Sequence, residues 1–438
     1  MDLSPGSALI AQAHRVDLTW NTAIVWALWL VVGFVGIFPG IVAYMVWLER
    51  KAAGRFQDRV GPNRVGPFGL LQPIADAVKL IVKENIVPRH ADGLLHLLAP
   101  VLVLVSAFLS LAVVPFAVGL MPIDPPSGLL YLIAVSSISP LGIFLAGWSS
   151  RNKYSLIGAM RAVAQLVSYE IPQVLATIPV VLWAGSLSLA TIFEHQARFG
   201  WNVFAPPGLL AFAIFAIAGA AEVNRAPFDI PEAESEIIAG YHTEYAGMRF
   251  GLFFLAEYLG VFVIACVTTV LFLGGGMPLP FSPFPTNLID GSIRRYVLVD
   301  AILLAVFLFK VLLFVLAMYW VRATLPRLRV DRLMNFAWKY LVPLCLLDIL
   351  LAALWFEIVV RPGRVSAGRW TAGMVVTGLL VWASVRFVFW VNRKLAAAGP
   401  IDADWPVVGA AREGVETDEG GGIIAREVGT TWPGLYSS

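Results

Sequence analysis

Long apolar runs alternate with short polar connections over most of this chain. A membrane-spanning helix needs about 20 predominantly apolar residues, because a rise of about 1.5 Å per residue must cross a hydrocarbon core of about 30 Å. The pattern therefore predicts an all-α polytopic membrane protein with about nine transmembrane helices. The expected spans lie near Trp20–Leu48, Leu94–Val118, Leu129–Trp148, Ser155–Ala184, Pro207–Glu222, Met248–Leu273, Tyr296–Trp320, Lys339–Val360 and Trp370–Val391.

Basic residues in the connections predict which helix ends face the cytoplasm. Lys and Arg gather after the first, third and seventh runs, and cytoplasmic loops carry an excess of these residues. By alternation, the acidic segment after the fifth run lies on the same side. The loop before the ninth run disagrees, because Arg361, Arg364 and Arg369 would lie outside. Two topologies stay open: a ninth helix inserted against the rule, which we favour, or a run that does not span the membrane.

The spans predict four parts of the chain. A short N-terminal segment, 1–19, precedes a main helical domain, 20–360, which contains a basic loop at 49–93 and an acidic loop at 222–247. One additional helix and a C-terminal tail then follow. These last two parts are 370–391 and 392–438.

The basic loop contains a predicted surface helix over Leu70–Glu84. Polar residues recur on one face of it and apolar residues on another, which is typical of a helix lying at a membrane surface. The polar positions are Gln72, Asp76, Lys79 and Lys83. Such a helix either anchors the loop at the interface or covers a lateral opening between the spans.

Composition agrees with a membrane protein and excludes several kinds of function. Apolar residues make up 59% of the chain, charged residues 14%, and mean hydropathy is +0.79. The formal charge of +2 is too small to indicate nucleic-acid binding. Cys266 and Cys345 stand apart inside apolar runs and the five histidines are scattered, so we expect no disulfide framework, metal site or bound redox cofactor. The N-terminus lacks the features of a cleaved signal peptide, so the first run is expected to be retained.

The fourth apolar run carries a polar stripe. Arg161, Gln165 and Tyr169 are four residues apart and share one face, which must contact other helices. Glu170 follows near the middle of the run, with no adjacent Lys or Arg. A carboxyl group at that depth indicates a proton or ion path, although interhelical hydrogen bonding alone is the alternative.

A dense group of acids follows the fifth run. Glu222 ends that run, and Glu257 lies a turn or more into the sixth. Between them, Pro231 and the acids after it are typical of a helix start, which would explain Glu232 and Glu234 without any chemical role. The whole group is either a proton path or a solvated cytoplasmic loop. Its members are Glu222, Asp229, Glu232, Glu234, Glu236, Glu244 and Glu257.

Three segments of the chain resemble a known family. They are ERKAAGRFQDRVGPNRVGPFGLLQPIADAVKLIVKE at 49–84, LIGAMRAVAQLVSYE at 156–170 and EVNRAPFDIPEAESEIIAGYHTEYAGMRFGLFFLAEY at 222–258. Together they resemble the signature segments of the family of subunit 1 homologues of respiratory complex I, the proton-translocating NADH:quinone oxidoreductase. The resemblance covers about Trp20 to Val360, whereas the ninth helix and the tail depart from the eight-helix family pattern.

The resemblance implies a membrane subunit that docks the electron-transfer arm, encloses much of the quinone tunnel and couples quinone reduction to proton translocation. It places three basic residues, two acids and one aromatic residue along the tunnel, namely Arg50, Arg59, Arg225, Asp76, Asp229 and Phe228. It assigns a further set to an acidic proton relay, namely Glu170, Glu222, Glu232, Glu234, Glu236, Glu244 and Glu257 with Tyr169 and Tyr258.

The resemblance also implies the surroundings of the chain. Its substrate would be ubiquinone or menaquinone, while FMN and iron–sulfur clusters would belong to partner subunits. The expected partners are the peripheral-arm subunits of the quinone site, adjacent small membrane subunits and the lipid of a bacterial plasma membrane. Two alternatives stay open: the equivalent anchor of a membrane-bound hydrogenase or formate hydrogenlyase, and a cation–proton transporter. The transporter is disfavoured because no internal repeat is visible.

Overall fold

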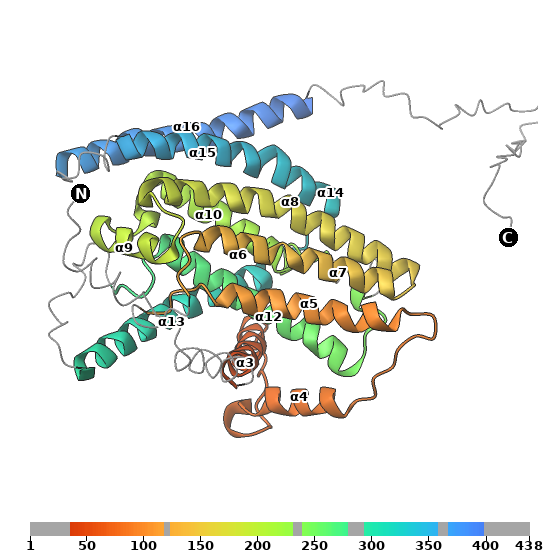
Figure 1. Cartoon of the computed structure of the whole chain (residues 1–438). Helices are drawn as coiled ribbons and strands as arrows, with labels where there is room; N and C mark the ends of the chain where they lie inside the picture. Colours follow the sequence, from red (N-terminus) through yellow and green to blue (C-terminus); the bar gives the residue numbers. More distant parts are fainter. Residues whose placement is uncertain (1–35, 118–122, 231–238, 279–292, 358–366, 398–438) are drawn as a thin grey trace, which may run out of the picture. The chain divides into compact units, whose positions relative to one another are not determined.

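A computed structural model of the chain describes residues 36–117, 123–230, 239–278, 293–357 and 367–397. These residues form helices and turns and contain no β-strand (Figure 1). Seven helices within them are long and apolar enough to cross a membrane, which confirms the predicted all-α polytopic membrane class. The seven are Gly93–Leu111, Gly128–Ser149, Lys153–Ala184, Gly247–Phe272, Asp300–Thr324, Val330–Trp355 and Gly373–Lys394.

The observed helices follow the predicted runs closely. The total of nine spans stays a prediction, because the first run begins outside the described residues and Pro206–Glu222 is a shorter apolar helix. The helices are α3 Phe38–Phe56, α4 Gln72–Val82, α5 Gly93–Leu111, α6 Gly128–Ser136, α7 Ile138–Ser149, α8 Lys153–Ala184, α9 Leu189–Phe199, α10 Pro206–Glu222, α12 Gly247–Phe272, α13 Ile293–Thr324, α14 Val330–Phe336, α15 Val342–Trp355 and α16 Ala367–Ala397. Shorter elements are the 3₁₀ turns η2 Pro67–Gly69, η3 Asn202–Phe204 and η4 Gly240–His242, and the π-helical segment η6 Ala337–Leu341 between α14 and α15.

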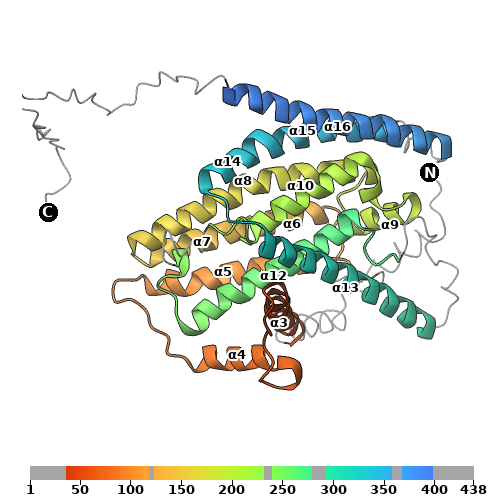
Figure 2. The same ribbon diagram turned by 180° about the vertical axis from the view of Figure 1, so that it is seen from behind.

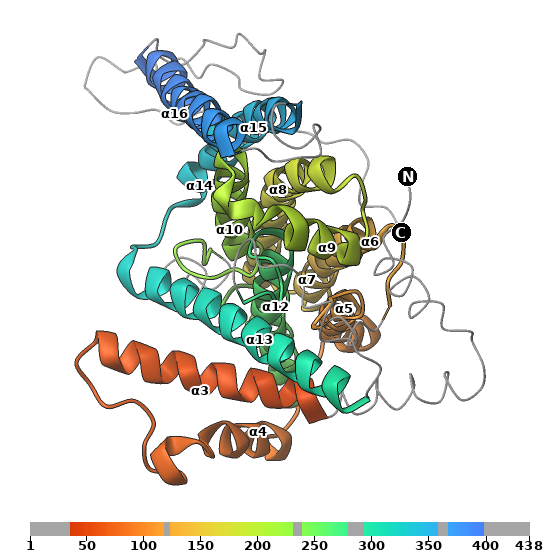
Figure 3. The ribbon, with the colours of Figure 1, turned by 90° about the vertical axis from the view of Figure 1, so that its left-hand side faces the viewer.

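Helix α12 lies at the centre of the packing within residues 1–392. Every residue from Val261 to Phe272 is buried, which is why this run reads as apolar on all sides. It contacts α5, α10 and α13 as well as α3, and Figure 3 shows it between α13 and α10. A side chain on α12 can therefore meet groups from most of the bundle.

A second group of helices packs in series beside α12. Helix α5 packs on α7, α7 on α8, and α8 on α10, and α15 covers α8 and α10 on the other side (Figure 2). The predicted polar stripe of α8 faces this interior, since Gln165 and Tyr169 are fully buried. Helix α8 also contains Pro172, two residues after Glu170.

The third predicted span is interrupted. It forms two helices, α6 and α7, which meet at Ser137. The hydroxyl of Ser136 donates to the carbonyl of Ile133, and Pro140 has no N–H to continue the helical ladder. These two effects explain a break that hydropathy alone does not reveal.

The predicted surface helix is observed as α4, and none of its residues is buried within the chain. Gln72 donates to Asp76 at 3.1 Å along the predicted polar face. The position of α4 at a membrane surface stays a prediction. The predicted helix start at Pro231 lies outside the described residues.

Helix α16, the additional predicted span, packs beside the segment that joins α14 to α15. Asn392 donates to the carbonyl of Lys339 at 2.6 Å, and the rings of Tyr340 and Phe389 lie 5.1 Å apart. Its sidedness and its role stay predictions.

Candidate functional site

Three of the predicted relay acids line a single internal cavity. Glu170 from α8, Glu222 from α10 and Glu257 from α12 all contribute to the wall of this space, which has a volume of about 90 Å³ and is called here the carboxylate cavity. Its wall also contains hydroxyl and amide groups, from Ser106, Ser110, Ser136, Ser139, Gln173 and Tyr241. The fold therefore brings together acids that are up to 87 positions apart in the sequence (257 − 170).

The carboxylate cavity is suited to water. It has room for several water molecules, since each needs only about 10–15 Å³ and two to four polar partners. Ser137, at the break between α6 and α7, donates a hydrogen bond to Glu170. One oxygen of Glu222 has no hydrogen-bond partner among the described residues. A polar cavity of this size thus lies against an unsatisfied carboxylate oxygen and two further acids.

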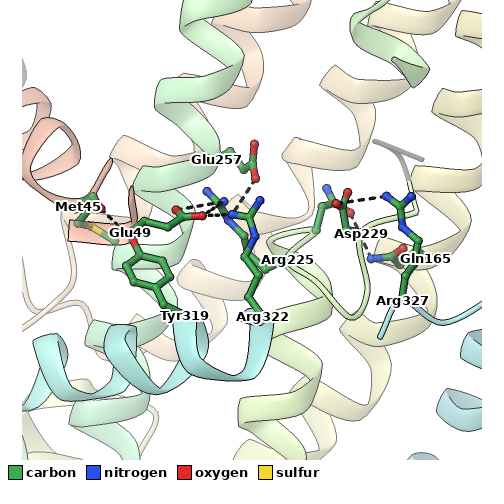
Figure 4. A network of polar contacts seen from close by, with 10 residues as sticks. Met45, Glu49, Gln165, Arg225, Asp229, Glu257, Tyr319, Arg322 and Arg327 are labelled. Carbon is green, nitrogen blue, oxygen red and sulfur yellow. Dashed lines mark hydrogen bonds and ion pairs between the residues drawn. The ribbon is translucent and has the colours of Figure 1, made fainter. Parts of the chain in front are cut away.

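A network of ion pairs lies next to this cavity (Figure 4). Arg225, in the loop after α10, places Nε 3.2 Å from Glu257 and Nη1 3.4 Å from each oxygen of Glu49. Arg322 from α13 contacts the same Glu49 carboxylate, and the Tyr258 ring lies 4.1 Å from the Arg225 guanidinium carbon. The network joins α3, α12 and α13 to the loop after α10.

The charge of Arg225 is fixed by this network. Burial by itself would lower the pKa of Arg225, but the carboxylates of Glu257 and Glu49 outweigh that effect and the pKa lies above its ordinary value. The side chain is 6% exposed. A buried charge persists only when it is paired, so Arg225 holds two acids together as a permanent cation.

The loop after α10 is held in place by the polar stripe of α8. Gln165 donates to the carbonyls of Ala221 and Phe228 at 2.8 and 2.7 Å. The Tyr169 ring lies 5.5 Å from the ring of Phe228, and Asp229 pairs with Arg327 at 3.2 Å. These contacts fix the backbone that carries Arg225.

Two larger cavities adjoin α3. One, of about 520 Å³, lies between α3, α4 and the start of α12 and is called here the apolar chamber. Arg50 and Asp76, paired at 2.5 Å, belong to its wall, which is otherwise mainly apolar. Apolar members of that wall include Val42, Val46, Leu80, Phe250, Phe254 and Leu255.

The second cavity, of about 990 Å³, is called here the arginine cavity. Its wall includes Arg50, Arg59, Arg64 and Arg322 together with Glu49. Because Arg50 lines both large cavities, the two are neighbours. Glu49 also contacts Arg225, which pairs with Glu257 in the wall of the carboxylate cavity. A line of charged groups thus runs from the arginine cavity to the carboxylate cavity.

The structure divides the tunnel residues expected from the sequence into two groups. Arg50, Asp76 and Arg59 line the two large cavities. The other three, Arg225, Phe228 and Asp229, line neither of these two cavities. They belong to the loop after α10, where Arg225 joins the acids, Phe228 packs on the Tyr169 ring and Asp229 forms its ion pair.

The structure also separates the predicted relay residues into those near Arg225 or the carboxylate cavity and those elsewhere. Tyr258 lies against Arg225, whereas Tyr169 donates to the carbonyl of Leu333 at 3.0 Å. Glu244 accepts a hydrogen bond from Asn152 at 2.7 Å and does not line the carboxylate cavity. Three further acids, Glu232, Glu234 and Glu236, lie outside the described residues.

Two central residues, Glu49 and Arg322, were not expected from sequence. Glu49 directly follows the first predicted span, next to Arg50, and Arg322 is one of the basic residues that follow the seventh. Both end apolar runs on the side predicted to be cytoplasmic. Opposite charges at neighbouring helix ends could have indicated their pairing, although no spacing rule specifies which ends meet.

The fold and the site together define a polytopic helical membrane protein with acids gathered around an internal cavity and an apolar chamber beside it. A family model described as NADH dehydrogenase matches residues 29–353. The chain therefore belongs to this NADH dehydrogenase family, which confirms the resemblance found in its signature segments.

Relatives of known name support the assignment. A protein from Brevibacillus brevis, named as the H subunit of NADH-quinone oxidoreductase, is 47% identical over 335 residues, 76% of this chain and 94% of the relative. Proteins of the same name from Dehalococcoides mccartyi and Leptospira biflexa are 49% and 43% identical, over 73% and 77% of this chain and 84% and 96% of the relatives. The similarity extends along 84–96% of the length of these three relatives.

Proposed function

We propose that this chain is the membrane subunit of a proton-pumping NADH:quinone oxidoreductase that encloses the quinone path and couples quinone reduction to proton translocation. The observation that carries the proposal is that Glu170, Glu222 and Glu257 share one cavity, which a line of charged groups connects to the larger cavities. The names of the relatives agree with this role.

The apolar chamber suits a quinone. A quinone has a long apolar tail and a polar head, so its path needs mainly apolar walls with a few polar groups. The walls contributed by α3, α4 and α12 supply the first property, and the Arg50–Asp76 pair supplies the second. In this proposal the tail lies along Val46, Leu80 and Phe254.

The line of charged groups is suited to coupling quinone reduction to proton transfer. Reduction of a quinone to a quinol takes up two electrons, supplied by partner subunits, and two protons. A change of charge near Glu49 would change the strength of its interaction with Arg225. The electrostatic potential at Glu257, which pairs with Arg225, would then change as well. Carboxyl groups connected by water can then pass protons in coupled steps along the cavity.

The arginine cavity is the proposed docking side. Arg59 and Arg64 lie on the loop between α3 and α4, which the excess of basic residues predicts to be cytoplasmic. We place the electron-transfer arm there, with small membrane subunits beside the bundle, in a bacterial plasma membrane. Ubiquinone and menaquinone both remain compatible with the apolar chamber.

The proposal is tested by Glu170→Gln in the complete complex. We expect normal assembly with suppressed quinone-linked NADH oxidation and proton pumping in vesicles, because the amide cannot release a proton. Asp331→Asn is the matched control, since Asp331 is exposed in the first turn of α14. Normal pumping by an assembled Glu170→Gln complex would remove the residue from the relay.

A tagged chain purified from membrane extracts distinguishes the alternative hydrogenase anchor. Mass spectrometry should identify a flavin-containing NADH-oxidising module among the copurifying proteins. Recovery of a nickel–iron hydrogenase in its place would overturn the assignment to NADH oxidation while leaving the fold and the cavities unchanged.

A further inference from the structure

Helix α12 lies between the apolar chamber and the carboxylate cavity, and its first turns contribute to both walls. The residues that line the chamber include Phe250, Gly251, Phe254 and Leu255. The residues that line the carboxylate cavity include Phe253, Ala256, Glu257 and Gly260. With about 3.6 residues per turn, these two sets lie on different sides of the helix. The two spaces are therefore neighbours with one helix between them.

The ring of Phe253 contacts both walls beside this helix. Phe253 lies one helical turn before Glu257 on the same face, and it is 2% exposed. Its ring centroid lies 5.4 Å from that of Tyr241, in the wall of the carboxylate cavity. It lies 5.0 Å from that of Tyr245, in the wall of the apolar chamber. The rings of Phe253 and Tyr245 thus extend, in contact, from one wall to the other.

Buried neighbours hold these two rings in place. The Tyr245 ring stacks on the ring of His96 at 3.9 Å, and its hydroxyl oxygen lies 3.3 Å from that of Ser149. The ring of His242 lies 5.4 Å from that of Phe253. A closely packed layer of this kind resists wetting, and hydrophobic constrictions close channels in the same way.

A second contact joins the carboxylate cavity to the spaces around α3, and it carries charge but no proton. Glu49, in the wall of the arginine cavity, and Glu257 both pair with Arg225, which lines none of the three cavities. Phe254, in the chamber wall, covers the Tyr258 ring at 4.7 Å, and that ring contacts Arg225. A guanidinium group stays protonated in proteins. Arg225 therefore transmits a change of electrostatic potential between the two acids and accepts no proton from either.

We propose that Phe253 is the centre of a proton-tight seal between the apolar chamber and the carboxylate cavity, so that quinone reduction acts on the relay acids electrostatically and takes no protons from them. This inference rests on the proposed function, since the seal matters only if quinone is reduced in the chamber and protons move through the cavity. The two protons of the quinol then come from the cytoplasmic side, separate from those that the carboxyl groups translocate. Phe253 itself transfers no proton.

The experiment measures the number of protons translocated per NADH oxidised by the complete complex in sealed vesicles. In Phe253→Ala the lost ring leaves a void between the carboxylate cavity and Tyr245, because surrounding side chains close such a space only partly. Water in that void would connect the quinone to Glu257, and protons used by the quinol would be withdrawn from translocation. We expect the ratio to fall to about half of its unmodified value, because a void bordered by polar groups admits water.

Two variants distinguish a seal from a general loss of packing. Phe253→Leu refills most of the space with an apolar side chain and should keep the unmodified ratio. Phe272→Ala removes a fully buried ring from the same helix, one that packs on Phe212 and Phe215 and lines none of the three cavities. It should lower the melting temperature as Phe253→Ala does and leave the ratio unchanged. A pH gradient imposed without NADH should decay at the unmodified rate in all three variants.

Four results would overturn the seal. One is an unchanged ratio in Phe253→Ala, and another is an equal fall in Phe253→Leu or Phe272→Ala. A third is faster decay of the imposed gradient in Phe253→Ala, which would assign the loss to a leak across the membrane. Phe253→Val is a second variant that opens the layer, and failure of both Phe253→Ala and Phe253→Val to assemble would make the residue architectural.

Failure of this inference is distinct from failure of the proposed function. The seal is tested by the ratio of protons to NADH, whereas the coupling role rests on pumping by Glu170→Gln. An unchanged ratio in Phe253→Ala would remove the seal and leave the relay in place. Normal pumping by Glu170→Gln would remove that acid from the relay, whatever the ratio measured for Phe253→Ala.

Discussion

Nε of Arg225 lies 3.2 Å from a carboxylate oxygen of Glu257, and both side chains are largely buried. Replacement of Arg225 by Gln removes this buried ion pair of Glu257, whereas Glu49 still contacts Arg322. Loss of one partner of a buried pair costs about 3–5 kcal/mol. We therefore expect Arg225→Gln to lower the melting temperature of the purified complex and to suppress quinone reduction.

The same geometry predicts which second change restores stability. Glu257→Gln combined with Arg225→Gln should recover much of the lost melting temperature, because both charges of the pair are then removed together. Glu49→Gln combined with Arg225→Gln should recover less, since it leaves Arg322 without its carboxylate partner. Equal recovery by the two double variants would contradict the pairing described here.

Arg50 should act on quinone binding and not on stability. The Arg50 and Asp76 side chains are 45% and 33% exposed, and exposed pairs contribute only about 0.2–1 kcal/mol. We expect Arg50→Ala to raise the quinone KM about threefold to tenfold, a loss of about 0.7–1.4 kcal/mol of binding. Arg55→Ala, an exposed position on the same helix, is the control. An unchanged KM with normal assembly would restrict Arg50 to a topological role.

Substitution of Gly251 tests whether the quinone tail passes through the apolar chamber. A Cβ there would lie 3.2 Å from the end of the Leu80 side chain, so alanine fits with a small adjustment, whereas leucine would project into the chamber. We expect Gly251→Leu to raise KM about tenfold or more for a long-tailed quinone, by the size of steric discrimination in apolar pockets. KM for a short-tailed analogue should change less. Equal effects on both quinones would argue against passage of the tail here.

The burial of His242 predicts that the folded protein loses stability as the pH falls. Burial lowers the pKa of His242 from 6.5 to about 3, so the folded protein holds it neutral. Between these values the unfolded chain binds a proton that the folded chain does not, and stability falls as pH falls. At about 1.4 kcal/mol per pH unit, this histidine should cost about 2 kcal/mol on going from pH 7 to pH 5.

Replacement by phenylalanine isolates that contribution. The ring of His242 packs near Phe250 and Phe253, with centroids 5.6 and 5.4 Å apart, so an aromatic substitute suits the space. His242→Phe should show a smaller fall in melting temperature from pH 7 to pH 5 than the unmodified complex. His90→Phe, at an exposed position, should show the full fall.

Much of the fold was predictable from the sequence because a bilayer imposes a simple length rule. The runs around Lys153–Ala184 and Gly247–Phe272 were recognised almost to the residue. The break at Ser137 was not, since it depends on the Ser136 hydroxyl bonding to Ile133 and on Pro140, and hydropathy records neither effect.

The candidate site was only partly predictable. The acids Glu170, Glu222 and Glu257 were identified because a carboxyl group inside an apolar run is costly and therefore conspicuous. Their gathering around one cavity depends on tertiary packing. Lys310 lies inside the seventh predicted span, but its partners are backbone carbonyls, which a sequence does not distinguish from any others.

Pro172 has a mechanical consequence for helix α8. Proline has no N–H, so the carbonyl of Ser168 loses its regular helical donor one turn earlier, next to Glu170. Pro179 has the same effect further along α8. If α8 bends at Pro172, the two ends of the helix move most and the residues next to Pro172 move least. A bend at Pro172 would therefore move Glu170 less than the helix ends and leave its contact with Ser137 in place.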